Sequence, residues 1–380
     1  MRERSRDRRD NLRDVGSGRR PAVAVERCGD GRPARRDRSD PGRASADLPC
    51  ALLAPGHRIS VTLRDAIRDL RIIVVGDVML DEYWFGDVQR ISPEAPVPIV
   101  RIARSEERPG GAANVARNIV ALGASATLLS VVGADSAADR LRTVLTEAGI
   151  DHRLQTDPHI RTTVKLRVIG QQQQMLRIDF EDAPSREVLD QKRAEFEQSL
   201  DAADLVVFSD YRKGALEHVE ELIRRVRARG KPVLVDPKGD EYGRYTGATV
   251  LTPNRAEFTA VAGSWNTQEE FESKAQALRR HLELDALLVT MSEQGMMLVR
   301  EGSVLHRPAQ AREVFDVSGA GDTVIAALAV MLAAGATWER TVDFANAAAG
   351  IVVSKLGTSV ATFEEVASVF EDIEAWSVSA

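Results

Sequence analysis

From Leu70 onward, short apolar runs alternate with amphipathic stretches of helical length, and this alternation constrains the fold more than any other feature. The apolar runs are rich in Val, Leu and Ile and have the length of strands that are buried on both faces. They cover residues 71–76, 126–133, 205–209, 232–235, 248–251 and 286–290. The helical stretches between them include 112–122, 138–148, 216–229 and 269–281. The alternation predicts an α/β fold with a central parallel sheet covered by helices on both faces.

No Pro-, Gly- or Ser-rich linker interrupts this alternation, so we expect one large domain over residues 66–380. Two segments depart from it. Residues 97–104 follow a Pro-rich turn, and residues 162–180 alternate polar and apolar side chains. We expect a small antiparallel β lid over the sheet, with strands around 82–104 and 160–180. A solvated edge hairpin is an equally good interpretation of the pattern.

Charge separates the first 65 residues from the rest. Residues 1–50 carry 14 Arg and 9 acidic side chains, whereas the other 330 carry 37 basic and 48 acidic ones. The first 65 residues have no apolar periodicity, so we expect a disordered, Arg-rich extension. We interpret it as lying upstream of the natural start of the protein, because it has the features of neither a signal nor a transit peptide.

The composition of the chain after the extension, which we call the body, excludes several function classes. Its acidic balance argues against binding to nucleic acid. No apolar run reaches the ~20 residues of a membrane-spanning helix. Both cysteines, Cys28 and Cys50, lie in the extension, so the body can form no disulfide of its own. We therefore expect a cytoplasmic protein that binds neither nucleic acid nor membrane.

Polar residues follow six of the predicted strands. In open α/β sheets, ligands bind at the carboxyl ends of the strands. Each residue alone is also an ordinary turn or helix-cap residue, but six together predict a polar cleft. They are Asp77, Asp135, Asp210, Asp236, Asn254 and Ser292.

Residues 316–322 (DVSGAGD) precede an apolar helical run over 323–334. Two glycines let the backbone approach a ligand, and the first amides of the helix point outward. Gly319, Ala320 and Gly321 therefore suit an anion hole for a phosphoryl group in transfer. Asp322 is placed to accept the proton of an attacking hydroxyl. Asp is also a common helix N-cap, so the motif alone leaves a structural role open.

A second glycine pair, Gly110 and Gly111, opens another predicted helix, in which Asn114 can pair with hydroxyl groups. The chain has no Gly-x4-Gly-Lys-Ser/Thr loop, which excludes a P-loop kinase. No Gly-x-Gly-x-x-Gly follows a strand, which argues against a dinucleotide enzyme. The six His residues are scattered and form no metal-binding pattern with Cys.

Four motifs, in this order, resemble the ribokinase-like (PfkB) sugar kinases: 75–81 (VGDVMLD), 109–114 (PGGAAN), 252–257 (TPNRAE) and 319–322 (GAGD). The resemblance implies a three-layer sandwich with a mostly parallel sheet and a β lid. Four further segments resemble the branch of this family that phosphorylates the anomeric hydroxyl of D-glycero-β-D-manno-heptose 7-phosphate, on the route to ADP-heptose and the lipopolysaccharide core. They are 81–84 (DEYW), 90–98 (RISPEAPVP), 209–214 (SDYRKG) and 236–239 (DPKG). The resemblance is to the monofunctional form, without a nucleotidyltransferase domain.

The resemblance also implies roles for individual residues. It makes Asp322 the catalytic base and 319–321 the anion hole for the γ-phosphate of ATP. Its nucleotide-binding residues are Asn254, Glu257, Ser292, Gly295 and Asn346, with Glu257 organising Mg²⁺ through water. Its sugar-binding residues are Asp77, Asp81, Gly110, Gly111 and Asn114. The family often has Thr where Val317 or Ser318 stands, which leaves activation by a monovalent cation open.

An acidic body repels a sugar phosphate, so local cations must hold the phosphate group of the substrate. The candidates are Lys165, Arg177, Lys213 and Lys238. Arg177 is the first choice, because its planar fork can donate two charge-assisted hydrogen bonds. The apolar residues Val164, Leu166 and Val168 suit a homodimer that forms through the lid, as in related kinases.

Two other functions remain open. The chain could be a ribokinase-like kinase for another sugar, sugar phosphate or nucleoside. It could also be a non-catalytic sugar-binding regulator on the same fold, although the presence of Asp322, Asn254 and Glu257 argues against it.

Overall fold

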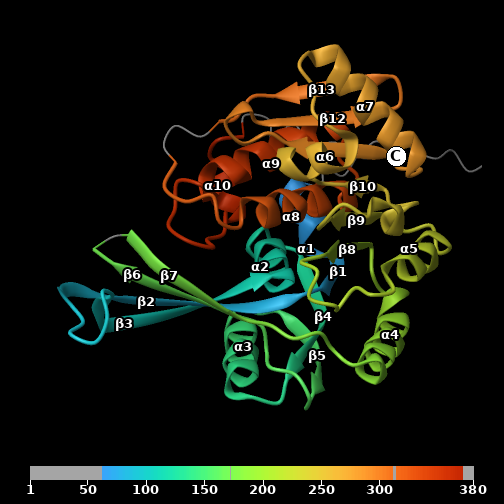
Figure 1. Cartoon of the computed structure of the whole chain (residues 1–380). Coiled ribbons are helices and arrows are strands. Elements are labelled where there is room, and N and C mark those ends of the chain that lie inside the picture. The colour runs from blue at the N-terminus through green and yellow to red at the C-terminus, as the bar shows by residue number, and fades with distance from the viewer. Residues whose placement is uncertain (1–61, 172, 311–313, 371–380) are drawn as a thin grey trace, which may run out of the picture. The chain divides into compact units, whose positions relative to one another are not determined.

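A computed structural model of the chain describes residues 62–171, 173–310 and 314–370, and a nine-stranded sheet runs through the middle of this part (Figure 1). The strand order is β13-β12-β11-β10-β9-β8-β1-β4-β5. Pairing is parallel from β11 to β5 and antiparallel at β11–β12 and β12–β13. The strands are β1 (Arg71–Gly76), β4 (Ser125–Gly133), β5 (Asp151–Asp157), β8 (Leu205–Ser209), β9 (Val233–Asp236), β10 (Val250–Leu251), β11 (Ala286–Thr290), β12 (Met296–Arg300) and β13 (Ser303–Arg307).

Helices cover both faces of this sheet, and each face has its own apolar core. Alternate residues of β1 point to opposite cores: Ile72 and Val74 to the first, Ile73 and Val75 to the second. This confirms the predicted three-layer α/β architecture. The first core contains residues of α1 (Leu63–Arg68), α2 (Ala112–Ala121), α3 (Ser136–Glu147), α8 (Ala320–Ala333), α9 (Trp338–Val352) and α10 (Phe363–Ala367). The second contains residues of α4 (Arg186–Leu200), α5 (Val219–Arg227), α6 (Arg255–Ala262), α7 (Gln268–His281) and the short helix η1 (Tyr242–Tyr245).

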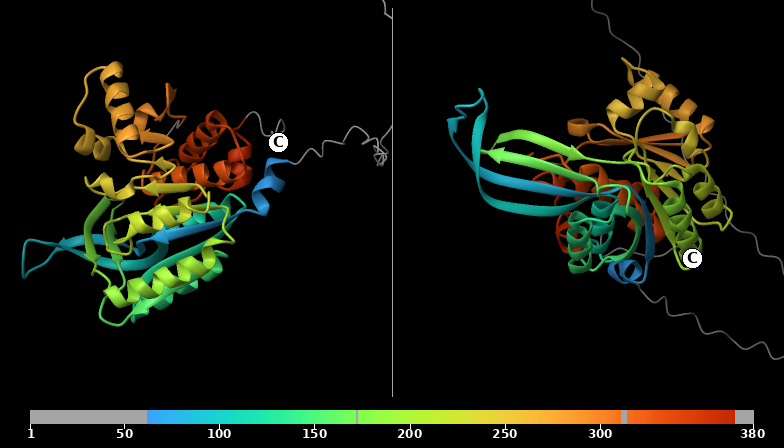
Figure 2. Two further views of the ribbon diagram at one scale, coloured as in Figure 1. Left: turned by 90° about the vertical axis from the view of Figure 1, so that its right-hand side faces the viewer. Right: turned by 60° about the horizontal axis from the view of Figure 1, so that its bottom comes forward.

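A second, four-stranded sheet forms the lid, which projects away from the large sheet as a long ribbon (Figures 1 and 2). Its order is β3-β2-β6-β7. The sequence-based prediction of an antiparallel lid is correct for β2–β3 and β6–β7, but β2 and β6 pair in parallel. These two strands come from separate parts of the chain, so no turn fixes their direction. The strands are β2 (Val78–Ile91), β3 (Pro98–Gly111), β6 (Val164–Gly170) and β7 (Gln173–Phe180).

The strand register gives the lid two different faces. On the first face, Asp81 lies beside Lys165, which lies beside Asp179; in the next row Tyr83, Arg167 and Arg177 are neighbours. Neighbouring residues in register point to the same side of a sheet, so this face is polar and charged. The opposite face carries Trp84, Leu166, Val168, Leu176, Ile178 and Phe180.

The helix α1 corrects the expected start of the domain at residue 66. It begins at Leu63, and the side chains of Leu63 and Ile67 are buried in the first core. Thr62 caps it by accepting a hydrogen bond from the amide of Asp65 at 3.2 Å. A single i, i+4 apolar pair is too short a pattern to stand out in the sequence. The rest of the expected extension, residues 1–61, lies outside the described residues.

Among the described helices, none is both long and apolar enough to span a membrane.

Candidate active site

Three neighbouring strands of the large sheet end in carboxylates. Asp77 follows β1, Asp210 follows β8, and Asp236 is the last residue of β9. Because these strands are adjacent and parallel, their carboxyl ends meet at one edge of the sheet, as the sequence predicted. Two of the other strand-end residues, Asp135 and Asn254, act as helix N-caps, which is their ordinary structural role.

Asp322 lies in the first turn of α8 and is 3 % exposed. Its Oδ2 accepts a hydrogen bond from Nδ2 of Asn114 at 2.7 Å, and its Oδ1 accepts one from the hydroxyl of Tyr211 at 2.8 Å. The helix N-cap is Gly319, so capping is not the role of Asp322. The two donors come from α2 and from the loop after β8, so three separate segments fix the position of one carboxylate.

Burial raises the pKa of Asp322 to about 6, while the hydrogen bonds from Asn114 and Tyr211 lower it. The group is therefore ionised for the most part at neutral pH, yet more basic than an exposed Asp. This combination suits a general base. Burial also raises the pKa of Tyr211 well above its ordinary value, and the charge of Asp322 raises it further, so the phenol stays protonated and donates.

The backbone before α8 suits an anion. Within the part of the chain that the structure describes, the amides of Gly321 and Asp322 have no acceptor, because they stand at the free end of the helix. The positive end of the helix dipole adds to their attraction for negative charge. Gly319 has φ +79°, and a Cβ there would lie 2.7 Å from Nδ2 of Asn114. The turn therefore needs glycine at this position. The amide of Ala320 bonds to the carbonyl of Val317 at 3.2 Å, so it contributes less than expected.

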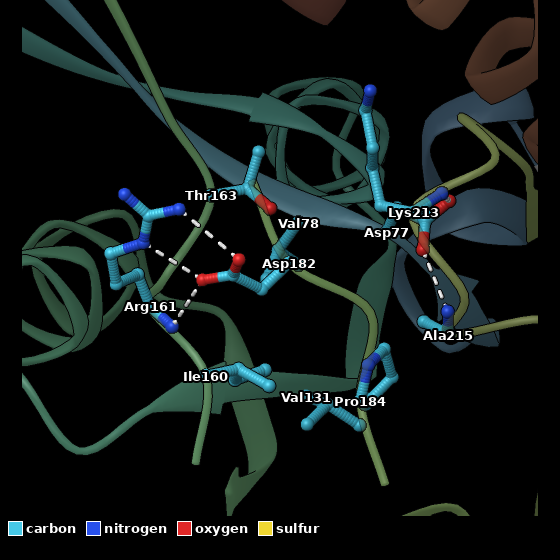
Figure 3. Close-up of a pocket in the computed structure, with 10 residues that line it drawn as sticks. All are labelled: Asp77, Val78, Val131, Ile160, Arg161, Thr163, Asp182, Pro184, Lys213 and Ala215. Carbon is cyan, nitrogen blue, oxygen red and sulfur yellow. Dashed lines mark hydrogen bonds and ion pairs between the residues drawn. The ribbon is translucent and has the colours of Figure 1, made fainter. Parts of the chain in front are cut away.

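Asp77 holds a loop of the backbone. Its carboxylate accepts hydrogen bonds from the amides of Tyr211, Lys213 and Ala215 at 2.8–3.0 Å. The buried Lys192 of α4 donates to the carbonyl of Ala215 from the other side. Asp77 thus positions the loop that presents Tyr211 to Asp322, a role that the sequence did not predict. Figure 3 shows Asp77 and Ala215 beside a small pocket of about 10 Å³, which has room for about one water molecule.

The glycine pair allows the close approach that the sequence predicted. A Cβ on Gly110 would lie 2.4 Å from Oδ2 of Asp81, and a Cβ on Gly111 would lie 2.4 Å from the carbonyl oxygen of Asp77. Gly111 also has φ +60°. Asp81 is buried and accepts a hydrogen bond from Nη1 of Arg167 at 2.6 Å. The pair therefore brings Asp81 and Asn114 to the same end of the sheet.

The expected nucleotide-binding residues lie on three segments: the start of α6, the turn after β11, and α9. Asn254 and Glu257 form a capping box at the start of α6, in which each side chain accepts the other's amide proton at 3.0 Å. Gly295, with φ +87°, follows Ser292 in the turn after β11. Nδ2 of Asn346 in α9 donates to the carbonyl of Pro308 at 2.8 Å.

Each of the four cations expected to hold the substrate phosphate has a neighbour of opposite charge. Lys213 pairs with Glu181, and Lys238 pairs with Glu257 at 2.7 Å, beside the expected nucleotide site. Arg177 forms a two-pronged pair with Asp179 at 2.9 and 3.0 Å, and its side chain is 51 % exposed. Lys165 is close to Asp81 and lies 5.5 Å from the ring of Tyr211. Burial lowers its pKa.

The structure also places residues at the site that sequence reasoning did not select. Tyr211 donates to Asp322. Asp236, which the sequence placed in the polar cleft without a further role, lies close to Asp322 and Glu257, and burial together with their charges raises its pKa well above its ordinary value. Arg108 and Arg167 stand on the polar face of the lid. Tyr211 and Asp236 lie within segments that carried the family resemblance, which was the available signal. No sequence signal identified Arg108 and Arg167, because their position on the lid face depends on strand register.

Residues 69–364 match the family described as pfkB family carbohydrate kinase. The chain belongs to this family. The kinase is 55 % identical over 303 residues to the "D-beta-D-heptose 7-phosphate kinase" of Bordetella bronchiseptica, which covers 80 % of this chain and 97 % of that protein. It is 50 % identical to the "Bifunctional protein HldE" of Coxiella burnetii and 53 % identical to that of Pseudomonas paraeruginosa. The kinase spans only 64 % and 62 % of the length of these two proteins.

Solved structures agree with the fold of the kinase. Phosphofructokinase-2 from Escherichia coli, in complex with potassium, matches with a TM-score of 0.67 at 20 % identity, over 80 % of this chain and 99 % of that one. Arabidopsis thaliana ribokinase, complexed with ribose and ATP, matches with a TM-score of 0.65 at 20 % identity, over the same shares of the two chains. Both support the ribokinase-like architecture with its lid. The chain is thus an ATP-dependent sugar kinase by family.

Proposed function

We propose that this kinase transfers the γ-phosphate of ATP to the anomeric hydroxyl of D-glycero-β-D-manno-heptose 7-phosphate, which yields the 1,7-bisphosphate for ADP-heptose synthesis. The observation that carries the proposal is the position of Asp322 at the start of α8, beside two amides that have no acceptor among the described residues. The name of the relative at 55 % identity, a "D-beta-D-heptose 7-phosphate kinase", supports the choice of sugar.

In this proposal Asp322 accepts the proton of the sugar hydroxyl as the oxygen attacks the γ-phosphate. Tyr211 and Asn114 donate to the same carboxylate and hold it in place. The amides of Gly321 and Asp322 stabilise the negative charge that spreads over the transferred group. The protein therefore works through positioning and electrostatics rather than through a covalent intermediate.

We include Mg²⁺ in the proposal, which neutralises charge on the ATP phosphates when bound. Mg²⁺ usually binds one or two carboxylates together with water and substrate phosphates. Asp236 fits this pattern, because its one side-chain donor among the described residues is the hydroxyl of Thr252 at 3.3 Å. Glu257 is close enough to raise the pKa of Asp236 and would hold the ion through water. Comparing rates in potassium and in choline salts tests for activation by a monovalent cation.

The proposal extends to assembly and location. The apolar face of the lid exposes Trp84, Leu176, Ile178 and Phe180 by 37–54 %. Exposed apolar patches of this kind mark protein interfaces, and a second copy of the same lid would cover it. The structural neighbours include a tetrameric form of phosphofructokinase-2. Because the co-substrate is ATP, we place the enzyme in the cytoplasm.

The decisive experiment measures ADP release, coupled to NADH oxidation, across sugars and their 5-, 6- and 7-phosphates. We expect the highest kcat/KM with D-glycero-β-D-manno-heptose 7-phosphate. A higher value with another sugar would give the enzyme a different substrate within the family. No ADP release with any sugar, combined with sugar binding by calorimetry, would support the non-catalytic regulator.

A further inference from the structure

The polar face of the lid borders a cleft with a volume of about 930 Å³. The opposite wall comes from the loop before α8 and from the loop around Leu356. Its lining includes Tyr83, Arg104, Arg108, Arg167, Asp316 and Ser318. A volume near 1,000 Å³ is typical of a pocket for a small molecule. The cleft adjoins the anion hole, since Ser318 directly precedes Gly319.

Two arginines converge in this cleft on one tyrosine ring. The guanidinium groups of Arg108 and Arg167 lie 5.2 and 5.1 Å from the centre of the Tyr83 ring. The side chains of Arg167 and Arg108 are only 15 % and 21 % exposed. Their positions are therefore fixed before a ligand arrives, so little side-chain entropy is lost on binding.

Each arginine is held by some of its nitrogens and keeps others free. Arg167 donates through Nη1 to Asp81, and Arg108 donates through Nη1 to the carbonyl of Leu356 at 2.6 Å and through Nη2 to Glu106 at 3.0 Å. Among the described residues, Nε and Nη2 of Arg167 and Nε of Arg108 have no acceptor. Guanidinium groups that are partly shielded from water and still have free N–H donors suit a phosphate.

Arg108 and Arg167, which together we call the clamp, are also connected to the catalytic end of the cleft. A Cβ on Gly357 would lie 2.1 Å from Nη1 of Arg108, so the arginine tip packs directly on this loop. The next residue, Thr358, has its methyl carbon 3.4 Å from the position of a Cβ on Gly319. A sugar with its anomeric carbon at Asp322 can therefore extend toward the lid arginines.

We propose that Arg108 and Arg167, with Arg104 at the outer edge, bind the phosphate group that the sugar substrate already carries. The inference rests on the proposed function in so far as the substrate is a sugar phosphate. It differs from the sequence-based choice of Arg177, which is exposed, bonded to Asp179 and not among the described residues that line the cleft.

The test compares the wild-type enzyme with Arg167→Met and Arg108→Met, which keep most of the side-chain volume. Arg140→Met is the matched control, because Arg140 also pairs with lid carboxylates, Glu82 and Glu107, but on the opposite face. We expect KM for the sugar phosphate to rise by about 10-fold or more in each cleft variant, as for the loss of a charged hydrogen bond. KM for ATP should change by less than about 2-fold. The control should match the wild type in both.

A second measurement separates a lost phosphate contact from a damaged fold. The wild type should prefer the phosphorylated sugar over the same sugar without phosphate by about 10-fold or more in kcat/KM, and both cleft variants should lose that preference. Arg167→Lys keeps the positive charge but not the planar guanidinium fork. Its preference for the phosphorylated sugar should lie between that of the wild type and that of Arg167→Met. Inorganic phosphate should compete with the sugar phosphate in the wild type and more weakly in the variants.

The outcomes distinguish this inference from the proposed function. If a different sugar phosphate proves to be the substrate and the variants behave as expected, the phosphate site at the clamp is supported. The heptose phosphate is then rejected as the substrate. A preferred substrate without a phosphate group would overturn the clamp. An equal rise in KM for ATP would assign the arginines to the nucleotide. If KM for the sugar phosphate rises in Arg177→Ala but in neither cleft variant, the phosphate site is at Arg177 instead.

Discussion

Asp322 is subject to two opposing effects. Burial favours the neutral acid, whereas a base must be ionised, and the hydrogen bonds from Asn114 and Tyr211 restore much of the stability of the charged form. With a pKa of about 6, roughly ten carboxylates are ionised for each one protonated at pH 7. The surroundings thus keep the group charged while making it a stronger base than an exposed Asp.

Asp322→Asn tests the base directly. We expect kcat to fall about 10²–10⁴-fold, the usual contribution of general base catalysis. The melting temperature should stay within about 4 °C of the wild type, because the hydroxyl of Tyr211 can turn to accept from the new amide. Steady-state kinetics and calorimetry measure the two effects. Near-normal turnover in this variant would remove Asp322 from its role.

Tyr211→Phe tests how the base is positioned. Because only the carboxylate can accept a proton, kcat should fall as the pH drops through about 6 in the wild type. Removing the hydrogen bond from Tyr211 takes away an effect that lowers the pKa of Asp322. The acid limb of the pH–kcat profile should therefore move to higher pH. A lower kcat with an unmoved limb would mean that Tyr211 acts only through packing.

Sequence reasoning selected the residues whose position follows from local chain geometry. Gly319, Asp322, Gly110 and Asn114 stand in glycine turns or first helical turns, where the spacing alone implies close approach and outward amides. The partners of the base were harder to predict. Tyr211 reaches Asp322 because three amides of its loop bind Asp77, a contact across more than 130 residues that no periodicity records.

At the level of elements, strands that form the buried middle of the sheet were predicted almost to the residue. β1 and β11 have the expected bounds, because a run of Val, Leu and Ile between polar turns has few other interpretations. The lid was predicted less completely. β2 begins at Val78 and β3 extends to Gly111, since these strands continue from the core into the lid without a break in pattern.

The helix α1 gives a prediction about truncation. Removing residues 1–61 should leave the free energy of unfolding and the activity unchanged, because that segment has no apolar periodicity to bury. Removing residues 1–68 should lower the free energy of unfolding by about 3 kcal/mol or more, since two fully buried side chains are lost. Urea unfolding of the two truncated proteins measures the difference. Equal stability of both would contradict the position of α1 in the core.

At the level of the whole molecule, the apolar face of the lid predicts the assembly. Introducing charge with Leu176→Asp or Ile178→Asp should convert a dimer to monomers, because an interface cannot bury an unpaired carboxylate without a large cost. Val369→Asp is the control, since Val369 is 52 % exposed, close to the 54 % of Leu176, but lies outside the lid. Sedimentation velocity gives the masses. A wild type that sediments as a monomer would contradict the proposed dimer.

The strand pairing of the lid also sets how its backbone amides exchange with solvent. Near the root, β2 is bonded on both sides, to β3 and to β6, but its pairing with β6 ends at Gly86. Beyond that point β2 pairs, among the described strands, with β3 alone, and an isolated two-stranded ribbon is marginally stable. Amide protons from 87 to 91 should therefore exchange much faster than those from 78 to 85. Because Gly86 and Asp87 line the cleft, a bound sugar phosphate should slow exchange at this boundary, which makes deuterium uptake there a local record of occupancy.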